Sequence, residues 1–535
     1  MTFNTAPPVR NKLLIAVAIA CGSTSSIRAG ELQVTPSITT SGFYYKTETG
    51  QEPSDSTLAI SLIPKLVSVY SGRRASAAVV VTNTTVEQNS DLSNTDKSFT
   101  ELSYNSSLQI VDKVLTLSVN GDRSYRSTDA SQGLVADKVL SSGELTKIAN
   151  DAIQLNFVIP NPKTVGLSLQ SGFSKTSSDE TLTSTNGIDG ENTFLNAQIY
   201  QGSDLTGFTF LLSSQYYDTK RESAQDFSST LSSARFGVDI TRDISIVLVG
   251  SDSKYGLDET GFSAQRQNLD TTSYGAGFVW QPYGENSIEL TYNELEQGDT
   301  STRFIGLNTQ WAFSERTSMQ FNYGKRFYGN AYSFNLDYRL KSFSTSASYN
   351  EDVTSYSRLS FSEGPSSLFV CPIGSIEFAD CFQPSSIGYA LQAGEEFRSL
   401  NSFTTDIIDE TLFRKFGQIN LGYDKRKFKA ALSLIYNTTE YLESAREQTT
   451  QSAFLSLSYQ LNKRTTLGFS SNYSTIEYSD SANINDVLSL TANFNRELSR
   501  QLSMNVSTRY VSRETEDVNR DLTDSRLTVS FNYKF

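Results

Sequence analysis

The final segment of the chain, residues 527–535, alternates strictly between apolar and polar side chains. Leu527, Val529, Phe531, Tyr533 and Phe535 occupy the odd positions, and every even position is polar. Because successive side chains of a β-strand point to opposite faces, this pattern predicts a strand with one apolar and one polar face. Since no residue follows Phe535, we expect the strand to pair with an earlier segment.

Alternation of the same kind recurs along the rest of the chain. Clear examples lie at residues 115–120, 274–280, 305–313, 428–436, 467–473, 488–494 and 502–510. Phe and Tyr, which favour strands, are plentiful at 32 and 27, whereas Pro is scarce at 11. Counting the segments predicts an all-β fold of roughly 24 antiparallel strands, within a range of about 22–26. The stretch 138–159 fits one strand or two.

The connections between these segments alternate between short and long. Short ones include 71–74, 111–113, 241–243, 314–316, 340–342, 424–427, 461–464 and 497–501. Long ones include 51–56, 87–97, 128–137, 176–191, 218–225, 256–269, 443–451 and 514–524. Outer-membrane barrels have short periplasmic turns and long external loops. The asymmetry therefore predicts that residues 31–535 form a single transmembrane, up-and-down β-barrel with its apolar face toward lipid.

The composition agrees with such a barrel and leaves one alternative. Apolar residues make up 37% of the chain, and no run approaches the ~20 apolar residues that a membrane-spanning helix needs. A secreted all-β repeat protein would share this composition. It would have no reason to alternate short and long connections throughout, so we favour the barrel.

The first 30 residues have the pattern of an export signal. Arg10 and Lys12 precede an apolar run over 13–21, which is too short to span a bilayer. The segment 26–29 (Ser-Ile-Arg-Ala) then offers a small residue at a cleavage point before Gly30. The segment 18–21 (Ala-Ile-Ala-Cys) also fits a lipoprotein cleavage box, which would place processing at Cys21.

Charge and residue usage exclude several classes of function. The net charge is −13, and no basic cluster is dense enough to follow phosphates, so we expect no nucleic-acid partner. The chain contains no histidine, which removes the commonest general base and every Ser-His or Cys-His mechanism. Carboxylates are spread through the loops and no catalytic pair stands out, although a glycosidase-like pair in the lumen is a remaining alternative. We therefore expect no enzymatic activity, cofactor or metal.

One connection is unlike the others. Residues 351–410 show no clean alternation and contain three prolines together with Cys371 and Cys381. Since an exported protein meets an oxidising environment, we expect these cysteines to form a disulfide, and two sulfurs without histidine do not make a zinc site. The order of connections makes this loop external. It either folds inward as a cap or constriction, or decorates the surface.

Several side chains are expected at defined places on the barrel. Basic residues at polar positions of the strands should face the lumen, namely Arg126, Arg509, Arg513, Arg526 and Lys534. Asp122 and Glu289 lie on comparable faces. These groups either solvate a wide interior or form a polar track for carbohydrate, made of Arg, Asp and Asn with inward aromatic residues. Trp280 and Trp311 each precede a short connection, which predicts a place in the periplasmic aromatic girdle.

Two resemblances to known proteins add to these expectations. The ending with Phe531, Tyr533 and Phe535 resembles the C-terminal signal that the insertion machinery of bacterial outer-membrane barrels reads. The order of the segments 34–45, 56–78 and 108–117, with Leu-Ile-Pro-Lys-Leu at 62–66 and Ser-Gly-Arg-Arg at 71–74, resembles the outer-membrane β-barrel family associated with PEP-CTERM/exosortase systems. This second resemblance covers roughly residues 33–130, and the loop with Cys371 and Cys381 has no counterpart in the family pattern.

The family resemblance implies a place beside exopolysaccharide-production machinery in the bacterial outer membrane, and it brings no catalytic motif. We therefore expect a passive pore or export conduit for extracellular polysaccharide. Its expected partners are membrane lipid, the barrel-insertion machinery, polysaccharide and periplasmic export components. The alternative is a structural or surface-interaction barrel whose lumen is closed by loops and which transports nothing.

Overall fold

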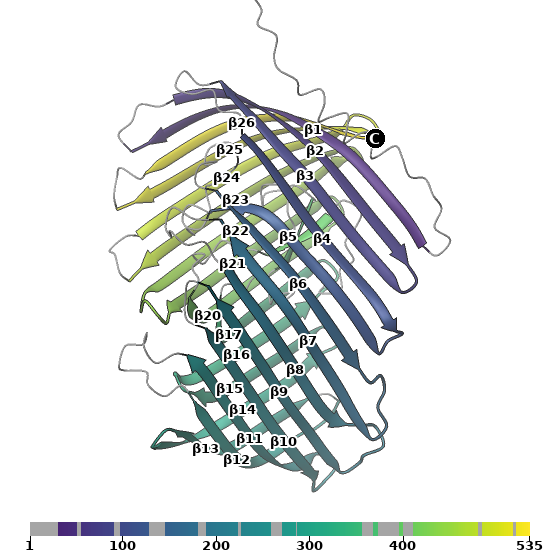
Figure 1. Cartoon of the computed structure of the whole chain (residues 1–535), viewed down its shortest axis with the longest axis vertical. Coiled ribbons are helices and arrows are strands. Elements are labelled where there is room, and N and C mark those ends of the chain that lie inside the picture. The colour runs from purple at the N-terminus through teal and green to yellow at the C-terminus, as the bar shows by residue number, and fades with distance from the viewer. Residues whose placement is uncertain are drawn as a thin grey trace, which may run out of the picture.

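The sheet closes on itself as an antiparallel barrel of 24 strands (Figure 1). Barrel strands pair with their neighbours along the chain, and β1 (Gly30–Thr49) pairs with both β2 (Asp55–Gly72) and β26 (Leu522–Lys534). The predicted all-β class, up-and-down order and strand number are therefore confirmed. The computed structural model describes residues 30–50, 55–89, 97–127, 138, 145–179, 189–222, 226–257, 270–284, 286–355, 368–372, 395–399, 410–479, 484–516 and 521–535.

The other strands follow in chain order. The first half of the barrel contains β3 (Ala75–Asn89), β4 (Lys97–Val111), β5 (Leu115–Arg126), β6 (Thr146–Val158), β7 (Val165–Ser178), β8 (Asp189–Gln201), β9 (Phe208–Arg221), β10 (Phe227–Asp239), β11 (Ile244–Leu257), β12 (Thr271–Trp280) and β13 (Ser287–Gln297). The second half contains β14 (Thr300–Ser314), β15 (Thr317–Arg326), β16 (Gly329–Arg339), β17 (Phe343–Ser355), β20 (Thr411–Lys425), β21 (Phe428–Tyr441), β22 (Glu447–Asn462), β23 (Thr465–Tyr478), β24 (Ile484–Glu497) and β25 (Leu502–Thr515). A separate pair is β18 (Leu368–Pro372) with β19 (Glu395–Ser399). Among the described residues, no helix is long and apolar enough to cross a membrane.

Side chains alternate between the two faces of the sheet, as β26 shows. Leu527 and Phe531 point outward and are 48% and 44% exposed, whereas the inward Asp524 and Arg526 are 1% and 5% exposed. Outward apolar side chains occur right around the barrel. A closed sheet leaves no backbone N–H or C=O group unpaired at an edge, and apolar side chains on the exterior can contact the hydrocarbon of a bilayer. The protein is therefore a transmembrane barrel of the bacterial outer membrane.

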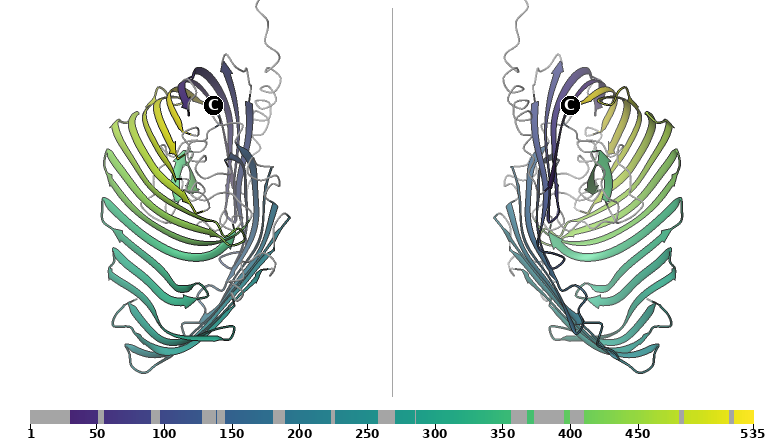
Figure 2. Two further views of the ribbon diagram at one scale, coloured as in Figure 1. Left: turned by 90° about the vertical axis from the view of Figure 1, so that its left-hand side faces the viewer. Right: turned by 90° about the vertical axis from the view of Figure 1, so that its right-hand side faces the viewer.

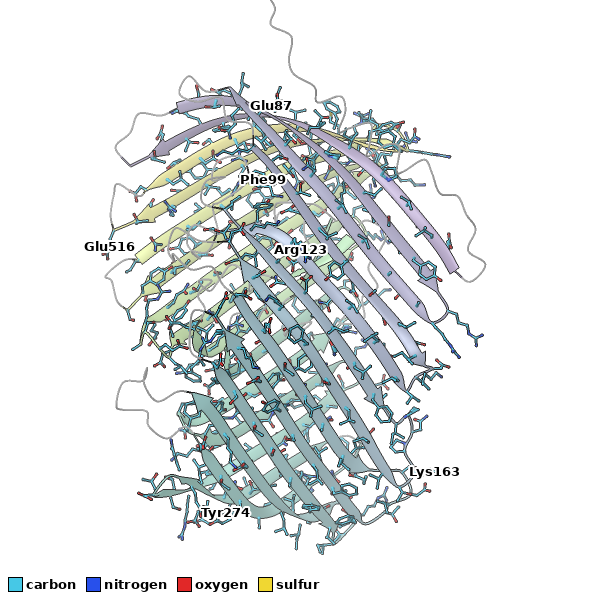
Figure 3. The ribbon with its side chains drawn as sticks, in the orientation of Figure 1. Glu87, Phe99, Arg123, Lys163, Tyr274 and Glu516 are labelled. Carbon is cyan, nitrogen blue, oxygen red and sulfur yellow. The ribbon has the colours of Figure 1, made fainter. Side chains whose placement is uncertain are left out.

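The two ends of the barrel carry different connections. At the end called here the turn end, the connections include 73–74, 112–114, 240–243, 315–316, 340–342 and 463–464. At the opposite end, the loop end, they include 90–96, 127–145, 179–188, 258–270 and 356–410. Figure 3 marks the turn end with Lys163, on the right, and the loop end with Glu516, on the left.

Two expected boundaries differ clearly in the structure, and one open alternative is settled. The 443–451 loop is only the connection 442–446, because Thr438 and Glu440 continue the ladder opposite Thr449 and Glu447, and β-branched Thr suits a strand. The irregular span expected from 351 begins after Ser355, since β17 stays paired with β20 up to that residue. The stretch 138–159 contributes one barrel strand, β6. The loop end also has tight turns at 298–299 and 327–328, which the sequence reading did not anticipate.

The barrel is flattened. Figure 1 looks across it, so that front strands such as β4–β9 cross the strands of the back wall. In the views along the barrel (Figure 2), the two walls converge toward β12 and β13. At this corner Arg235 on β10 reaches Glu289 on β13 at 2.7 Å, although two strands lie between them. A Cβ on inward-facing Gly277 of β12 would stand 2.0 Å from the Leu290 carbonyl oxygen, so only glycine permits this close approach.

The β18–β19 pair lies inside the barrel and not in its wall. Figure 2 shows it between the two walls, in the wider half of the barrel. Its register places Cys371 opposite Glu396. This part of the long connection between β17 and β20 therefore occupies the lumen.

Candidate solute path inside the barrel

The basic residues expected in the lumen lie on the inner face wherever their side chains are described. Arg509 on β25 is directly opposite Arg526 on β26, whose guanidinium lies 3.4 Å from Asp524. The Arg526 guanidinium also faces the ring of Phe43 on β1 at 5.9 Å. Arg513 shares this inner face, Lys534 is exposed at the turn end, and the side chain of Arg126 lies outside the described residues. Arg526 is therefore held in the wall by an acid and an aromatic ring.

Burial of the inner face changes along the barrel. On β21, Thr439 and Asn437 toward the loop end are 0% exposed, whereas Lys429 near the turn end is exposed. On β3 the same gradient runs from buried Val86 to exposed Ser76. The loop-end half of the lumen is therefore largely filled, and the turn-end half is more open.

A polar contact joins strands that are not neighbours in the sheet. Arg221, the last residue of β9, has a side chain that is 0% exposed and pairs with Glu443, beyond β21, at 2.7 Å. The same Glu443 oxygen accepts hydrogen bonds from the backbone N–H and the hydroxyl of Thr411 on β20, at 3.2 and 3.3 Å. This cluster, called here the clasp (Arg221, Thr411 and Glu443), bridges the barrel at its loop end.

Aromatic rings form a continuous row beside the clasp. The ring row starts at the buried Phe227 on β10 and ends at the buried Phe413 on β20. Its centroid distances are 6.5 Å for Phe227–Tyr255, 5.1 Å for Tyr255–Phe327, 5.1 Å for Phe327–Tyr328 and 4.4 Å for Tyr328–Phe413. The row thus carries apolar contact from one wall, through the β15–β16 turn, to the other.

Tyr328 is the polar exception within the ring row. Its hydroxyl oxygen is buried and has no hydrogen-bond partner among the described residues. Burial raises the pKa of this hydroxyl above its ordinary value, since the charged phenolate would be poorly solvated there.

Amide side chains line much of the inner face, and those on β20 and β21 are buried and bonded. Gln418 Nε2 donates to Asn420 Oδ1 at 2.9 Å, and the Ser433 hydroxyl donates to the same oxygen at 2.8 Å. Arg414 Nε donates to Asn437 Oδ1 at 2.7 Å. In this bonded wall (Arg414, Gln418, Asn420, Ser433 and Asn437), hydrogen bonds between side chains replace much of the water that burial removed, and Gln418 Oε1 is left without a partner among the described residues.

Five inward-facing amides of β14–β16 differ from those of the bonded wall. Asn308 and Gln310 on β14 lie opposite Asn322 and Gln320 on β15, and Gln320 lies opposite Asn335 on β16. These residues, called here the open wall, are exposed on the inner face. Within the described ranges, none of them makes a side-chain hydrogen bond to another residue.

Space and charge around the open wall are well defined. A Cβ on Gly324, the next inward position after Asn322 on β15, would meet no atom within 4 Å. Glu289 lies opposite Asn308, but its charge is compensated by Arg235. Further inward charges lie only beyond the amides on these strands, with Arg326 toward the loop end and Asp337 and Arg339 toward the turn end. The open wall itself is neutral.

The predicted aromatic residues lie on the outer face. Trp280 and Trp311 are at the turn end of β12 and β14, with ring centroids 6.1 Å apart. Phe531 and Tyr533 point outward from β26, and Phe535 beyond it is 65% exposed. Their assignments to an aromatic girdle and to an insertion signal stay predictions.

Other expectations fall partly outside the described residues. Cys371 lies in β18, but Cys381 is outside them, so the disulfide stays a prediction. The export signal also lies outside them, apart from Gly30. Within the parts of the chain that the structure describes, no group of three or more His, Cys, Asp or Glu could hold a metal ion.

Sequence reasoning missed the clasp and the ring row. Arg221 and Glu443 are 222 residues apart, and nothing local marks either as a partner. The sequence did contain one sign of the ring row. Phe327 and Tyr328 form the turn between β15 and β16, a position that Gly, Asn and Asp usually occupy.

Known proteins resemble this chain only in architecture. No protein-family model and no curated protein matches the sequence. Among solved structures, the siderophore receptor PirA from Acinetobacter baumannii is 8% identical, with 93% of this chain and 80% of that chain covered and a TM-score of 0.41. The FrpB iron transporter from Neisseria meningitidis is 8% identical, with 94% and 82% covered and a TM-score of 0.42. OpdK from Pseudomonas aeruginosa, solved with vanillate, is 9% identical, with 94% and 99% covered and a TM-score of 0.30.

Proposed function

We propose that this barrel is a passive conduit for extracellular polysaccharide, with its turn end in the periplasm and its loop end outside the cell. The observation that carries the proposal is the open wall, whose neutral amides are exposed and unbonded in the lumen. An amide both donates and accepts hydrogen bonds, which suits the hydroxyl groups of a sugar. The sequence resemblance over roughly 33–130 supports polysaccharide as the solute.

The proposal assigns partners to the rest of the molecule. Lipid covers the outward apolar belt, and the insertion machinery reads β26 with Phe535. Periplasmic export components dock at the turn end, where short basic connections such as Arg73 and Arg74 are exposed. The conduit needs no catalytic step and no cofactor.

A closed structural or surface-interaction barrel is the second candidate function. The clasp, the ring row and the β18–β19 pair inside the lumen favour it. In that case the filled loop-end half is permanent and no solute crosses.

Conductance of the purified full-length protein in planar bilayers separates the two functions. The conduit should give steady current steps of uniform size. Silence, with the protein folded and inserted as judged by its heat-modifiable migration, would support the closed barrel.

Orientation is tested on intact cells with an impermeant thiol reagent, using the natural chain as background. Glu516→Cys should be labelled and Arg426→Cys should not. The reverse labelling would invert the proposed orientation.

A further inference from the structure

We propose that the open wall is a binding surface for an uncharged polyhydroxyl chain, reached from the turn end of the barrel. This inference rests on the proposed conduit and names its selective element. It concerns Asn308, Gln310, Gln320, Asn322 and Asn335, which the sequence reading did not single out.

The first argument is the arrangement of the amides. The cross-strand pairs form two rows, one with Gln310, Gln320 and Asn335, the other with Asn308 and Asn322. Neighbouring strands lie ~4.8 Å apart and the two rows ~7 Å apart along the strands. Donors and acceptors are therefore repeated at a spacing that a chain of hydroxyl-bearing rings can follow.

The second argument is that these groups are free to bind. The same residue types on the bonded wall use their amides on one another, as Gln418 and Asn420 do at 2.9 Å. The open-wall amides have no such partner in the described part of the chain. Only water competes for them, so each hydrogen bond to a solute exchanges for a hydrogen bond to water.

The third argument concerns charge. The inward charge opposite this surface, Glu289, is paired with Arg235 at 2.7 Å. The remaining inward charges of these strands lie beyond the amides, at Arg326, Asp337 and Arg339. The surface therefore offers nothing to repay the desolvation of a charged solute, and it should favour neutral sugars over acidic ones.

The experiment measures binding of maltohexaose, with hexagalacturonate as the charged probe of equal length, to the full chain in detergent by calorimetry. In parallel, maltohexaose is added to the turn-end side of planar bilayers to measure current block. The test variant combines Gln310→Leu, Gln320→Leu and Asn322→Leu, which keep side-chain size but remove the amides. We expect maltohexaose to bind at least about tenfold more weakly to this variant, because roughly two or more hydrogen bonds are lost. Hexagalacturonate should bind the natural protein more weakly than maltohexaose does.

Two single variants control for place and for shape. Gln215→Leu removes an exposed inward amide from β9, outside the open wall, and should leave binding unchanged, whereas Gln320→Leu should weaken it. Gly324→Trp adds bulk beside the amides, where a Cβ meets no atom within 4 Å, and should abolish binding while the barrel still assembles.

The outcomes distinguish this inference from the conduit itself. Unchanged maltohexaose binding in the triple variant, equal losses from Gln215→Leu and Gln320→Leu, or a preference for hexagalacturonate would each overturn the binding surface. A protein that conducts ions but neither binds nor is blocked by maltohexaose would overturn it and leave the conduit standing. If the natural protein binds maltohexaose but never conducts, and the triple variant loses this binding, the conduit would be refuted and the binding surface supported.

Discussion

The bonded wall and the open wall use the same amide residue types on the same face of one sheet, yet only in the bonded wall do these side chains hydrogen-bond one another. On β20, Gln418 is 2% exposed and hydrogen-bonded to Asn420 and Ser433. On β15, Gln320 is exposed and has no side-chain partner in the described ranges. Hydrogen bonds offset the cost of burying an amide, since each polar group left unsatisfied costs about 1–3 kcal/mol. An exposed one bonds water, so its capacity stays available to a solute.

The difference comes from what stands in front of each wall. The bonded wall is covered, and its residues Asn437 and Ser433 are 0% and 1% exposed. The open wall faces an unfilled part of the lumen, because a Cβ on the neighbouring Gly324 would meet no atom within 4 Å. The amides of the bonded wall therefore stabilise the filled half of the barrel. The amides of the open wall are accessible to a solute that enters the lumen.

The largest expected effect contrasts two inward glycines, one at the packed corner and one on the open wall. Gly277→Val should prevent closure, because its Cβ would lie 2.0 Å from the Leu290 carbonyl oxygen and 2.7 Å from the Thr291 Cα. Gly324→Val should assemble normally, because its Cβ meets nothing within 4 Å. The yield of heat-modifiable barrel in the outer membrane measures both. Equal yields would contradict the packed corner.

A second pair of variants compares matched amides. Asn437→Leu should destabilise the barrel by about 1.5–3 kcal/mol, because a hydrogen bond to a charged group is lost; that bond is the one from Arg414 Nε. Asn322→Leu should change stability by no more than ~0.5 kcal/mol, as is usual for exposed positions. Urea unfolding of the purified proteins in lipid vesicles measures the difference. Similar losses at both positions would mean that the open wall is structurally bonded after all.

Most of the barrel could be predicted from alternation alone. A strand such as 522–534 alternates because lipid covers one face and the lumen lies behind the other, and each tight or long connection marks one end of the barrel. The errors arose where polar residues belong to strands. Glu447 and Thr449 were expected in the 443–451 loop, but they continue the ladder opposite Glu440 and Thr438.

The functional inner surface could be predicted only in part. Sequence alternation assigns Arg509 and Arg526 to the polar faces of their strands, but it cannot say that Asp524 lies 3.4 Å from Arg526. It also cannot tell that Gln418 is buried and Gln320 is exposed. Both are inward amides, and their burial depends on which residues lie across the lumen. Contacts such as Arg221 with Glu443 depend on the flattening of the barrel, which no local pattern encodes.

A smaller effect is expected from the clasp, which belongs to the filled half. Arg221→Met should leave the barrel assembled, since the strand ladder is intact, but should raise conductance by loosening the loop end. The stability loss should stay below the ~3–5 kcal/mol of a broken buried pair, because Thr411 still donates to Glu443. Lys46→Met is the matched control, since its pair with Glu48 is about half exposed and such pairs contribute little. An equal rise in conductance in both variants would show that the clasp does not help to close the loop end.

The smallest effect concerns the pH dependence of the ring row, through Tyr328. Burial raises the pKa of its hydroxyl above the ordinary value of 10.0. An open or unfolded row would release this proton near pH 10, whereas the closed row retains it. The closed state therefore binds more protons at high pH, and its stability must fall as the pH rises above 10, with no dependence below it. Arg326, Glu351, Asp352 and Tyr255 also act on this hydroxyl, and Lys415 faces the Phe413 ring at 5.4 Å.

Tyr328→Phe isolates the tyrosine from these other groups. It keeps the ring contacts with Phe327 and Phe413 and removes only a buried hydroxyl that lacks a hydrogen-bond partner among the described residues. The variant should be as stable as the natural protein or slightly more so, because burying an unbonded hydroxyl costs about 1–3 kcal/mol. Conductance measured from pH 8.5 to pH 11.5, about one and a half units on either side of the ordinary tyrosine pKa, should rise above pH 10 in the natural protein and less in the variant. The same rise in both proteins would show that another group opens the loop end, and the ring row would then be a fixed part of the filled half.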